Sequence, residues 1–440
     1  MACFAGLRTA EHMHLDLLYQ KYSASGHVST DTRKIIPGCL YVALRGEKFN
    51  GNSFAEEALR SGAGWAVIDD PEFAGLPGTT LVPDTLVALR DLARMHRSRL
   101  NIPVIGLTGS NGKTTSKELV HAVLSTTFRT YATRGNLNNH IGVPLTVLSI
   151  PHDTQMAVVE MGANHVGEIA LLSSIAQPTH GFITNIGKAH IGTFGGFENI
   201  IRGKTELFDF LLRTHGQVFI NSNNPILAPM IRRFRDPVLY PGPQDFIHVE
   251  LLETTPYLIC RADGGKPFQT GLSGAYNFEN IAAALAVGKF FGVDAHAAEA
   301  AVASYVPSNM RSQIITRGTN TVILDAYNAN PSSMEAAIRN LQIRKDERKA
   351  VILGDMYELG DDTEKEHRAL GEMLSGCGFD RVLLCGPLME AAARACTGAR
   401  HFLNKADLAA ALEAEPMMNT TVLIKASRGM SLESLAEVIR

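Results

Sequence analysis

The sequence predicts an α/β protein of three domains. Three observations lead to this prediction. The 440 residues are too many for one ordinary core. Apolar runs of strand length alternate with amphipathic runs of helix length. Finally, Ile102-Pro103 and Val306-Pro307 interrupt the alternation in the way that joints between domains do. We therefore expect domains over residues 1–100, 101–308 and 309–440.

Composition and charge narrow the class of protein. A hydrophobic content of 45% fits a soluble globular enzyme, and a net charge of −3 lacks the basic excess of a nucleic-acid surface. The longest apolar stretch, residues 281–293, is too short to span a bilayer, and Met1 to Ala10 lacks the pattern of a secretory signal. We expect a cytoplasmic protein with no membrane insertion, no nucleic-acid partner and reduced cysteine thiols.

The N-terminal domain is expected to be a small α/β unit. Strands are predicted over residues 39–44 and 65–69, with a helix over 51–59 between them and another over 86–100. Thr32 and Arg33, just before Pro37-Gly38, could hold a phosphate or a sugar. From the local sequence alone, an exposed turn with a solvated Arg33 is the favoured alternative.

The central domain opens with a strand that runs into a phosphate-binding loop. Val104–Thr108 reads as a buried strand, and a helix is expected over residues 117–128. Small residues let backbone N–H groups close around a polyphosphate, Lys113 adds a positive charge, and the Thr114 hydroxyl can bind the Mg²⁺ that accompanies ATP. The first glycine of the generic motif is replaced by Leu107, so a turn without ligand is the alternative. The loop residues expected to bind nucleotide are Gly109, Ser110, Asn111, Gly112, Lys113, Thr114 and Thr115.

Two further strands of this domain are followed by groups that suit a metal. The strand over 156–159 ends at Glu160, and the strand over 181–184 is followed by His190. Because parallel strands end at the same edge of a sheet, both side chains should lie near the phosphate loop. Glu160 is the more natural Mg²⁺ ligand, since Mg²⁺ prefers oxygen; a structural role for His190 is an equal alternative. Lys204 reads by pattern as a solvated helix lysine.

Asn277 and Asn280 stand at the start of a predicted helix, where their amides could read the edge of a base. Helix capping by Asn277 is an equal alternative. In the third domain, strands predicted over 321–325, 350–354, 381–385 and 421–425 indicate a Rossmann-like unit, and capping boxes are expected at Ser332 and Thr363. Asp325 and Asn328 follow a strand, and Arg311 follows the joint; these are positions for ligand contacts.

Several motifs resemble the Mur ligase family and its folylpolyglutamate synthetase relatives, over nearly the whole chain. They are the loop over 108–115, Asp31-Thr32-Arg33 with Pro37-Gly38, and the segments 136–145, 160–165, 325–331 and 354–360. The last four segments resemble the branch that adds D-alanyl-D-alanine. Asn50, Asn52, Tyr276 and Ala426 stand where that family usually has Asp, His, His and Gly.

The resemblance implies a UDP-binding N-terminal domain, a central P-loop ATPase-like domain and a Rossmann-like C-terminal domain. It implies that ATP drives amide formation between a UDP-N-acetylmuramoyl tripeptide and D-alanyl-D-alanine through an acyl phosphate, in the synthesis of peptidoglycan precursors, by a monomer. Two Mg²⁺ ions and a carbamylated Lys204 are also implied. The implied roles are catalysis by Lys113, Lys204, His190 and Glu160; ATP binding by Asn277, Asn280, Arg311 and Asp325; substrate binding by Thr32, Arg33, Asn138, Asn139 and Asn328; and metal binding by Thr114, Glu160, His190 and Lys204.

Two other functions remain open from the sequence. A sibling ligase would add a single amino acid to a shorter precursor, and a nucleotide-driven binding or mechanical protein would hydrolyse ATP without making a bond. The third residue of the tripeptide, diaminopimelate or lysine, is also open. Because Arg311 and Asp325 belong to the third domain, we expect this domain to hinge near residues 306–309 when ATP binds.

Overall fold

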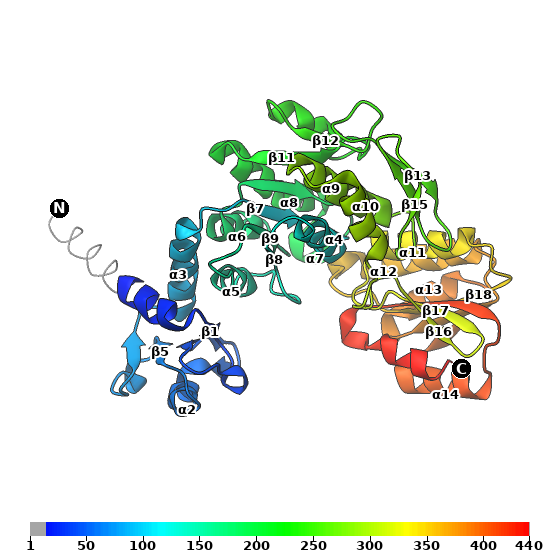
Figure 1. Cartoon of the computed structure of the whole chain (residues 1–440). Coiled ribbons are helices and arrows are strands. Elements are labelled where there is room, and N and C mark those ends of the chain that lie inside the picture. Colours follow the sequence, from blue (N-terminus) through cyan, green and yellow to red (C-terminus); the bar gives the residue numbers. More distant parts are fainter. Residues whose placement is uncertain (1–14, 440) are drawn as a thin grey trace.

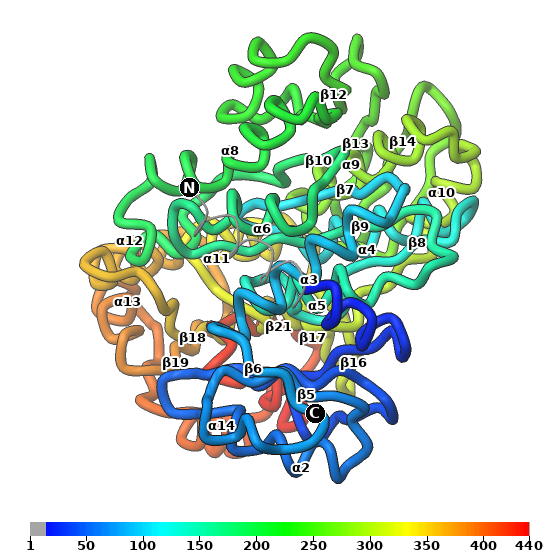
Figure 2. Tube along the Cα trace, turned by 90° about the vertical axis from the view of Figure 1, so that its left-hand side faces the viewer, coloured from blue at the N-terminus to red at the C-terminus, as the bar shows by residue number. Residues whose placement is uncertain are grey.

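The computed structural model describes residues 15–439 and consists of three α/β domains in the order expected (Figure 1). In Figure 1 the N-terminal domain, in blue, and the C-terminal domain, in yellow to red, lie on opposite sides below the central domain. The central domain again lies above both in the view turned by 90° (Figure 2). The predicted fold class is therefore confirmed. The expectations for Met1 to Ala10 and for Cys3 lie outside the described residues. Within residues 15–439, no helix is both long enough and apolar enough to cross a membrane.

The N-terminal domain is built on a parallel sheet of four short strands. Their order is β1 (Val28–Ser29), β2 (Leu40–Val42), β5 (Trp65–Ile68) and β6 (Thr79–Leu81). A short hairpin, β3 (Arg45–Gly46) with β4 (Phe49–Asn50), leads into a 3-10 turn (Gly51–Phe54) and helix α2 (Ala55–Arg60). Buried alanines of α2 pack against Tyr41 and Ile68 of the sheet.

Helix α3 (Thr85–Arg99) joins this domain to the central one. It packs against α5 (Gly142–Leu148) and α6 (Glu168–Ala176) of the central domain. The buried Arg97 guanidinium donates to the carbonyl oxygens of Leu100 and Ala176 at 2.7 and 2.9 Å. From a helix over residues 15–25, the Tyr22 hydroxyl donates to the Leu148 carbonyl at 2.6 Å. The junction is thus a packed and hydrogen-bonded interface.

The central domain has a six-stranded, fully parallel sheet. Its order is β12 (Val238–Tyr240), β11 (Gln217–Asn221), β10 (His180–Ile183), β7 (Val104–Thr108), β9 (Met156–Glu160) and β8 (Thr130–Ala132). Strand β7 lies between two others and is buried on both faces, which explains its continuous apolar run. Ile105 and Leu107 face helices α4 (Lys113–Ser125), α9 (Asn277–Phe290) and α10 (Ala295–Ser304). Val104 faces the opposite layer, which includes α6 and α8 (Phe197–Thr214).

Two features of this domain differ from the prediction. Helix α4 begins at Lys113 and not at residue 117, so the end of the phosphate loop is already the first turn of the helix. An antiparallel sheet of three strands was not predicted; it comprises β13 (Val249–Glu253), β14 (Ile259–Ala262) and β15 (Phe268–Gln269). Its edge strand β13 has two adjacent leucines, Leu251 and Leu252, and a bulge between Leu251 and Glu253, so no regular alternation marks it in the sequence.

The C-terminal domain has a six-stranded sheet that is parallel except for its first strand. The order is β16 (Gln313–Arg317), β17 (Asn320–Leu324), β21 (Thr420–Lys425), β18 (Arg348–Gly354), β19 (Arg381–Cys385) and β20 (Arg400–Phe402). The helices between strands are α11 (Pro331–Ile343), α12 (Thr363–Ser375), α13 (Glu390–Ala395) and α14 (Lys405–Ala414). The four strands predicted in this domain are present within two residues of their expected ends.

Both predicted capping boxes were wrong. Helix α11 is capped by Asn330, whose side chain accepts from the Ser333 N–H while the Ser333 hydroxyl accepts from the Asn330 N–H. Pro331 occupies the first helical position, which moves the cap two residues ahead of Ser332. Helix α12 has Asp362 at its cap position without a side-chain cap, and the Thr363 hydroxyl donates to the Gly360 carbonyl instead.

Candidate active site

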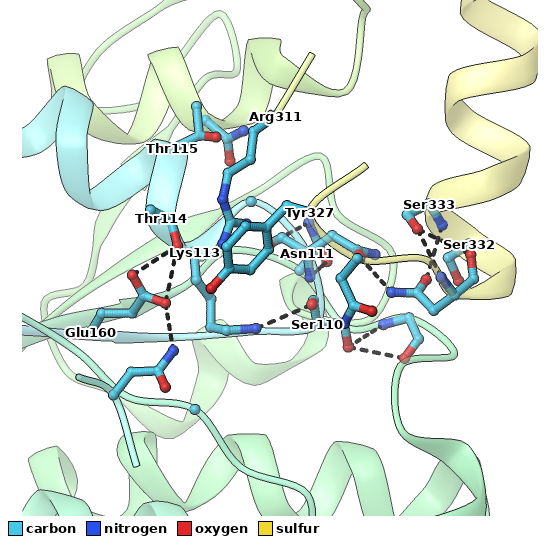
Figure 3. Close-up of a pocket in the computed structure, with 18 of the residues that line it drawn as sticks. Ser110, Asn111, Lys113, Thr114, Thr115, Glu160, Arg311, Tyr327, Ser332 and Ser333 are labelled. Atoms are coloured by element: carbon cyan, nitrogen blue, oxygen red, sulfur yellow. Dashed lines mark hydrogen bonds between the residues drawn. The ribbon is translucent and has the colours of Figure 1, made fainter. Parts of the chain in front are cut away.

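A cleft of about 850 Å³ lies between the central and C-terminal domains. Its floor is the phosphate loop at the carboxyl end of β7, and residues after β9, β10, β17 and β21 form its walls. Figure 3 shows Lys113, Thr114 and Glu160 together on the central side. Arg311, from the chain that enters the C-terminal domain, and Tyr327, from the segment after β17, lie next to them. The residues predicted at the ends of β7 and β9 therefore lie together at one edge of the sheet.

The phosphate loop requires glycine at two positions. Gly109 and Gly112 have φ angles of +151° and +76°. A Cβ atom on Gly109 would lie 2.0 Å from Thr184 Oγ1, and one on Gly112 would lie 2.4 Å from Asn280 Oδ1. A side chain at either position would clash, which explains the glycines at 109 and 112. Leu107 lies inside β7 and is not part of the loop.

The loop is also tied to the segment after β10. The N–H groups of Ser110 and Asn111 donate to the backbone and side-chain oxygens of Asn185 at 2.9 and 3.0 Å. The Ser110 hydroxyl donates to the Gly187 carbonyl and accepts from the Gly187 N–H, both at 2.9 Å. The loop conformation is thus held by hydrogen bonds to Asn185 and Gly187, which also line the cleft.

The Lys113 ammonium group lies folded over the loop, where it donates to the carbonyl oxygens of Gly109 at 2.7 Å and Ser110 at 3.2 Å. Burial lowers the pKa of Lys113 to about 8, with the Arg311 charge acting in the same direction and Glu160 opposing it. The positive charges of Lys113 and Arg311 repel each other. An anion bound between them, such as a phosphate, would stabilise both charges.

Thr114 and Glu160 lie together, as the sequence predicted. The Thr114 hydroxyl is 3.0 and 3.2 Å from the two carboxylate oxygens of Glu160, and Asn138 Nδ2 donates to Oε1 at 2.8 Å. Glu160 is only 1% exposed. Residues 15–439 contain no group of three His, Cys, Asp or Glu side chains that could hold a metal. One carboxylate and one hydroxyl beside a phosphate loop fit Mg²⁺, which binds through few protein ligands and keeps oxygens from phosphate and water.

His190 lines the same cleft at the start of helix α7 (Ile191–Phe194). Its backbone has a left-handed conformation with φ +56°, and its Nδ1 contacts a carboxylate oxygen of Glu358 from the C-terminal domain. This partner could not be predicted from local sequence, because Glu358 is 168 residues away along the chain.

The pattern-based interpretation of Lys204 as a solvated lysine was wrong. The residue is 1% exposed on α8, its Nζ donates to the Ala163 carbonyl at 2.9 Å, and it lies 5.2 Å from the centre of the Phe194 ring. Burial lowers its pKa well below the usual range; the Lys113 charge adds to this, while Glu168 and Glu206 oppose it. The helix pattern could not reveal the layer that covers this side chain.

The side chains of the two asparagines at the start of α9 are hydrogen-bonded to other protein groups. Asn277 does not cap the helix: its Nδ2 donates to the Ser273 carbonyl at 2.8 Å, and its Oδ1 accepts from Asn280 at 3.0 Å. Asn280 Oδ1 in turn accepts from the Ser116 hydroxyl at 2.8 Å. Both line the cleft, as does Tyr276, whose hydroxyl lies 2.7 Å from that of Ser312 across the domain boundary.

Arg311, Asp325 and Asn328 line the C-terminal side. The Arg311 guanidinium is 3.7 Å from the centre of the Tyr327 ring, and its Nε is buried with no hydrogen-bond partner among the residues described. Asp325 Oδ2 accepts from Lys425 Nζ at 2.6 Å, and the same ammonium donates to the Asn328 carbonyl at 3.1 Å. A buried donor without a partner suits an anionic ligand.

Tyr327 and Asn330 belong to the segment after Asp325 where ligand contacts were expected, whereas sequence reasoning missed three residues that line this side, namely Ser332, Ser333 and Lys425. The available signal for Lys425 was its position at the end of a predicted strand. Asn139, which was predicted, also lines the cleft, and its Oδ1 accepts from the N–H groups of Ile141 and Gly142 at 3.1 and 2.8 Å.

Thr32 and Arg33 do not belong to this cleft. They lie in a 3-10 turn (Thr32–Lys34) of the N-terminal domain, where the Arg33 side chain is 85% exposed and pairs with Asp31 at 2.8 Å. Asn52 in the same domain is buried, and its Nδ2 donates to Asn50 and Asp69, both at 2.8 Å. The two asparagines that depart from the usual family residues therefore bond to each other and to Asp69.

A phosphate loop that faces an arginine from a second domain defines a nucleotide-dependent enzyme whose site is shared between domains. Three protein-family models match the chain. They are described as "Mur ligase family, catalytic domain" over residues 26–97, "Mur ligase middle domain" over 107–288 and "Mur ligase, glutamate ligase domain" over 310–428. The chain belongs to the Mur ligase family, and it is an ATP-dependent ligase.

Curated relatives and solved structures agree with this family. The chain is 37% identical to the UDP-N-acetylmuramoyl-tripeptide--D-alanyl-D-alanine ligase of Bacillus subtilis, over 93% of this chain and 92% of the relative. It is 34% identical to the Escherichia coli protein of the same name, over 94% and 93%. A crystal structure of MurF from Acinetobacter baumannii is similar with a TM-score of 0.84 and 31% identity, over 94% and 93% of the two chains. MurF from Thermotoga maritima, solved in complex with ADP, is similar with a TM-score of 0.83 and 27% identity, over 94% and 96%.

Proposed function

We propose that this chain uses ATP to join D-alanyl-D-alanine to a UDP-N-acetylmuramoyl tripeptide, in the cytoplasm, during the synthesis of peptidoglycan precursors. The observation that carries the proposal is the cleft in which Lys113 and the Thr114–Glu160 pair face Arg311 of another domain. The names of the relatives support the choice of substrates.

The chemistry requires that a carboxylate oxygen be made into a leaving group. A carboxylate oxygen of the tripeptide attacks the γ-phosphorus of ATP, the bond from that phosphorus to the β–γ bridging oxygen breaks, and ADP leaves. The amine of D-alanyl-D-alanine then attacks the acyl carbon, and phosphate leaves as the amine loses a proton. The protein mainly aligns the groups and stabilises charge. Lys113, the N–H groups of the loop and Arg311 would act on the phosphates.

Mg²⁺ binding is proposed at two places. Thr114 and Glu160 would hold one ion, and His190 with a carbamylated Lys204 would hold a second. Bound Mg²⁺ neutralises phosphate charge. The buried Lys204 supports this role, because a neutral amine is the form that reacts with carbon dioxide, and the carbamate would turn a cation into an oxygen ligand.

The three domains are proposed to divide the substrates. Residues 1–100 would hold the UDP portion, with Thr32 and Arg33. Residues 101–308 would hold ATP, with Asn277 and Asn280 near the base, and residues 309–440 would complete the site through Arg311 and Asp325. Asn138, Asn139 and Asn328 would contact the peptide substrates. We propose a monomer as the active form.

A matrix of UDP-peptides against amines tests the proposal, with phosphate release and product mass as readouts. We expect an amide product only with a UDP-tripeptide and D-alanyl-D-alanine, and the preferred tripeptide identifies its third residue as diaminopimelate or lysine. Product from a UDP-dipeptide and a single amino acid would show the sibling ligase instead. Steady ATP hydrolysis without peptide or amine, and with no product in any pair, would show a nucleotide-driven mechanical protein.

A further inference from the structure

The loop after β18 of the C-terminal domain contacts His190 and the residues that follow it. Glu358 contacts His190 Nδ1 through its carboxylate and accepts from the Gly192 N–H through its carbonyl at 3.1 Å. A Cβ atom on Gly192 would lie 2.5 Å from the Gly360 nitrogen and 2.8 Å from the Leu359 carbonyl carbon. The two backbones therefore touch, and the absence of a side chain at Gly192 permits it.

Both partners adopt conformations that side chains usually avoid. His190 has φ +56° and Glu358 has φ +65°, both in the left-handed region. Such strained backbone conformations persist where the surroundings impose them. Here they accompany the contact between the imidazole of one domain and the carboxylate of the other.

The contact also fixes the chemistry of the imidazole. A carboxylate only accepts hydrogen bonds, so the Nδ1 that contacts Glu358 carries the proton. In the neutral ring that can bind a metal, Nε2 is then the nitrogen with a free lone pair, and within residues 15–439 no protein group is hydrogen-bonded to it. His190 lines the cleft, so the nitrogen able to bind a metal belongs to a ring oriented by the C-terminal domain.

We propose that Glu358 is a positioning residue that orients His190 for metal binding only while the C-terminal domain is docked. The inference rests on the proposed role of His190. It makes assembly of the second metal site a consequence of domain docking: the carboxylate arrives with the domain, sets the tautomer and the orientation of the ring, and departs with it.

The test counts bound Mn²⁺ by electron paramagnetic resonance, with a non-hydrolysable ATP analogue in saturating amount. Wild type should bind two ions. Glu358→Ala should weaken the second by about tenfold to a hundredfold, the range for lost partners of metal-binding histidines, and leave the first unchanged. Glu358→Gln keeps an acceptor for Nδ1–H and should recover part of the loss. In Glu358→Ala, ¹⁵N spectra of labelled histidine should show the His190 ring losing its single tautomer.

Two further variants separate positioning from general docking. Gly192→Ala keeps both side chains but forces the backbones apart, so it should weaken the second ion as Glu358→Ala does. Glu366→Gln removes a different contact of the same interface, the ion pair from Lys188 to Glu366 at 2.6 Å, and should change the second ion by less than about twofold. Melting curves check that each variant folds.

The proposal is overturned if Glu358→Ala leaves the second ion and the ring tautomer unchanged, or if Glu366→Gln causes an equal loss. It is also overturned if wild type binds one ion only. Failure of the proposed function would give a different result. Wild type would then form no amide with any substrate pair, whatever number of Mn²⁺ ions it binds.

Discussion

The ammonium group of Lys113 can be removed without disturbing the loop that holds it, because other groups fix that loop. Ser110 and Asn111 remain bonded to Asn185 whatever stands at 113. We predict that Lys113→Ala retains less than a tenth of wild-type ligation, a loss of at least about 1.4 kcal/mol of transition-state stabilisation. Phosphate release measures the activity, and an unchanged melting temperature should show that the fold survives. Activity above a tenth would contradict the assigned role.

The lowered pKa of Lys113, about 8, predicts how nucleotide binding depends on pH. Phosphate binds the protonated amine, so affinity for the non-hydrolysable ATP analogue should be constant below pH 8 and should fall above it, by up to tenfold per pH unit. Calorimetric titrations between pH 7 and 9.5 measure this. Lys113→Arg is the matched control: its guanidinium stays protonated over this range, so the same decline in that variant would assign the pH effect to another group.

Lys204 offers a chemical test of the proposed carbamate. Lys204→Ala should abolish ligation, and short carboxylates such as formate or acetate should restore part of it by supplying the missing anionic oxygen. Lys204→Arg keeps a positive charge and cannot form the carbamate, so it should stay inactive with or without carboxylate. Full activity of Lys204→Ala would remove Lys204 from the site.

At the scale of single elements, the true cap of α11 gives a stability prediction. Asn330 caps the helix and also donates to Asn111 Oδ1 of the phosphate loop at 2.8 Å. Asn330→Ala should lower the free energy of unfolding by about 1 kcal/mol, the usual value of a lost cap. Ser332→Ala removes no cap but does remove the acceptor of the Lys188 N–H at 2.9 Å, a contact between domains at an exposed position, and should change it by less than about 0.5 kcal/mol. Urea titrations compare the two, and equal losses would show that the domain contacts and not the cap matter.

Elements defined by local signals were predictable from the sequence. The buried run of β7, the glycines at 109 and 112 and the positions of Thr114 and Glu160 follow from patterns a few residues long. These patterns report the immediate neighbours of a residue. They therefore identified the floor of the cleft and most of its sheet.

The remaining features depend on contacts between distant segments. Lys204 is buried because α8 is covered by other parts of the chain, and Glu358 meets His190 only because two domains dock. Lys425 lies beside Asp325 because β21 pairs with β17, about 100 residues apart in sequence. No local pattern carries this information, since periodicity tells which face of an element is apolar but not what covers that face.

At the scale of the molecule, the structure moves the expected hinge. The Tyr305 hydroxyl and Asn309 Nδ2 both donate to Glu118 on α4, so the two ends of the predicted hinge at 306–309 are tied to the central domain. Met310 and Ser312 just beyond have φ angles of +57° and +56°. We therefore predict the pivot at residues 310–312, where the backbone is held in strained conformations.

Small-angle scattering tests the domain movement. We predict that the free protein has a larger radius of gyration than its complex with the ATP analogue and UDP-tripeptide, because contacts such as Arg311 with phosphate are available only when the domains are docked. The complex should match the structure described here. Identical radii in both states would exclude a hinge, and Arg311 would then need a role in a permanently docked site.

The two layers over the central sheet are completed at different times during synthesis on the ribosome. Helices α6 and α8 are present once residue 214 has been made, whereas the opposite face, with Ile105 and Leu107, waits for α9 and α10, which end at residues 290 and 304. A nascent chain between these lengths carries the strands up to β10 with an apolar face that is still partly open. Such a face favours association with other unfinished chains, so we expect the long segment between α8 and α9 to make the nascent chain prone to aggregation.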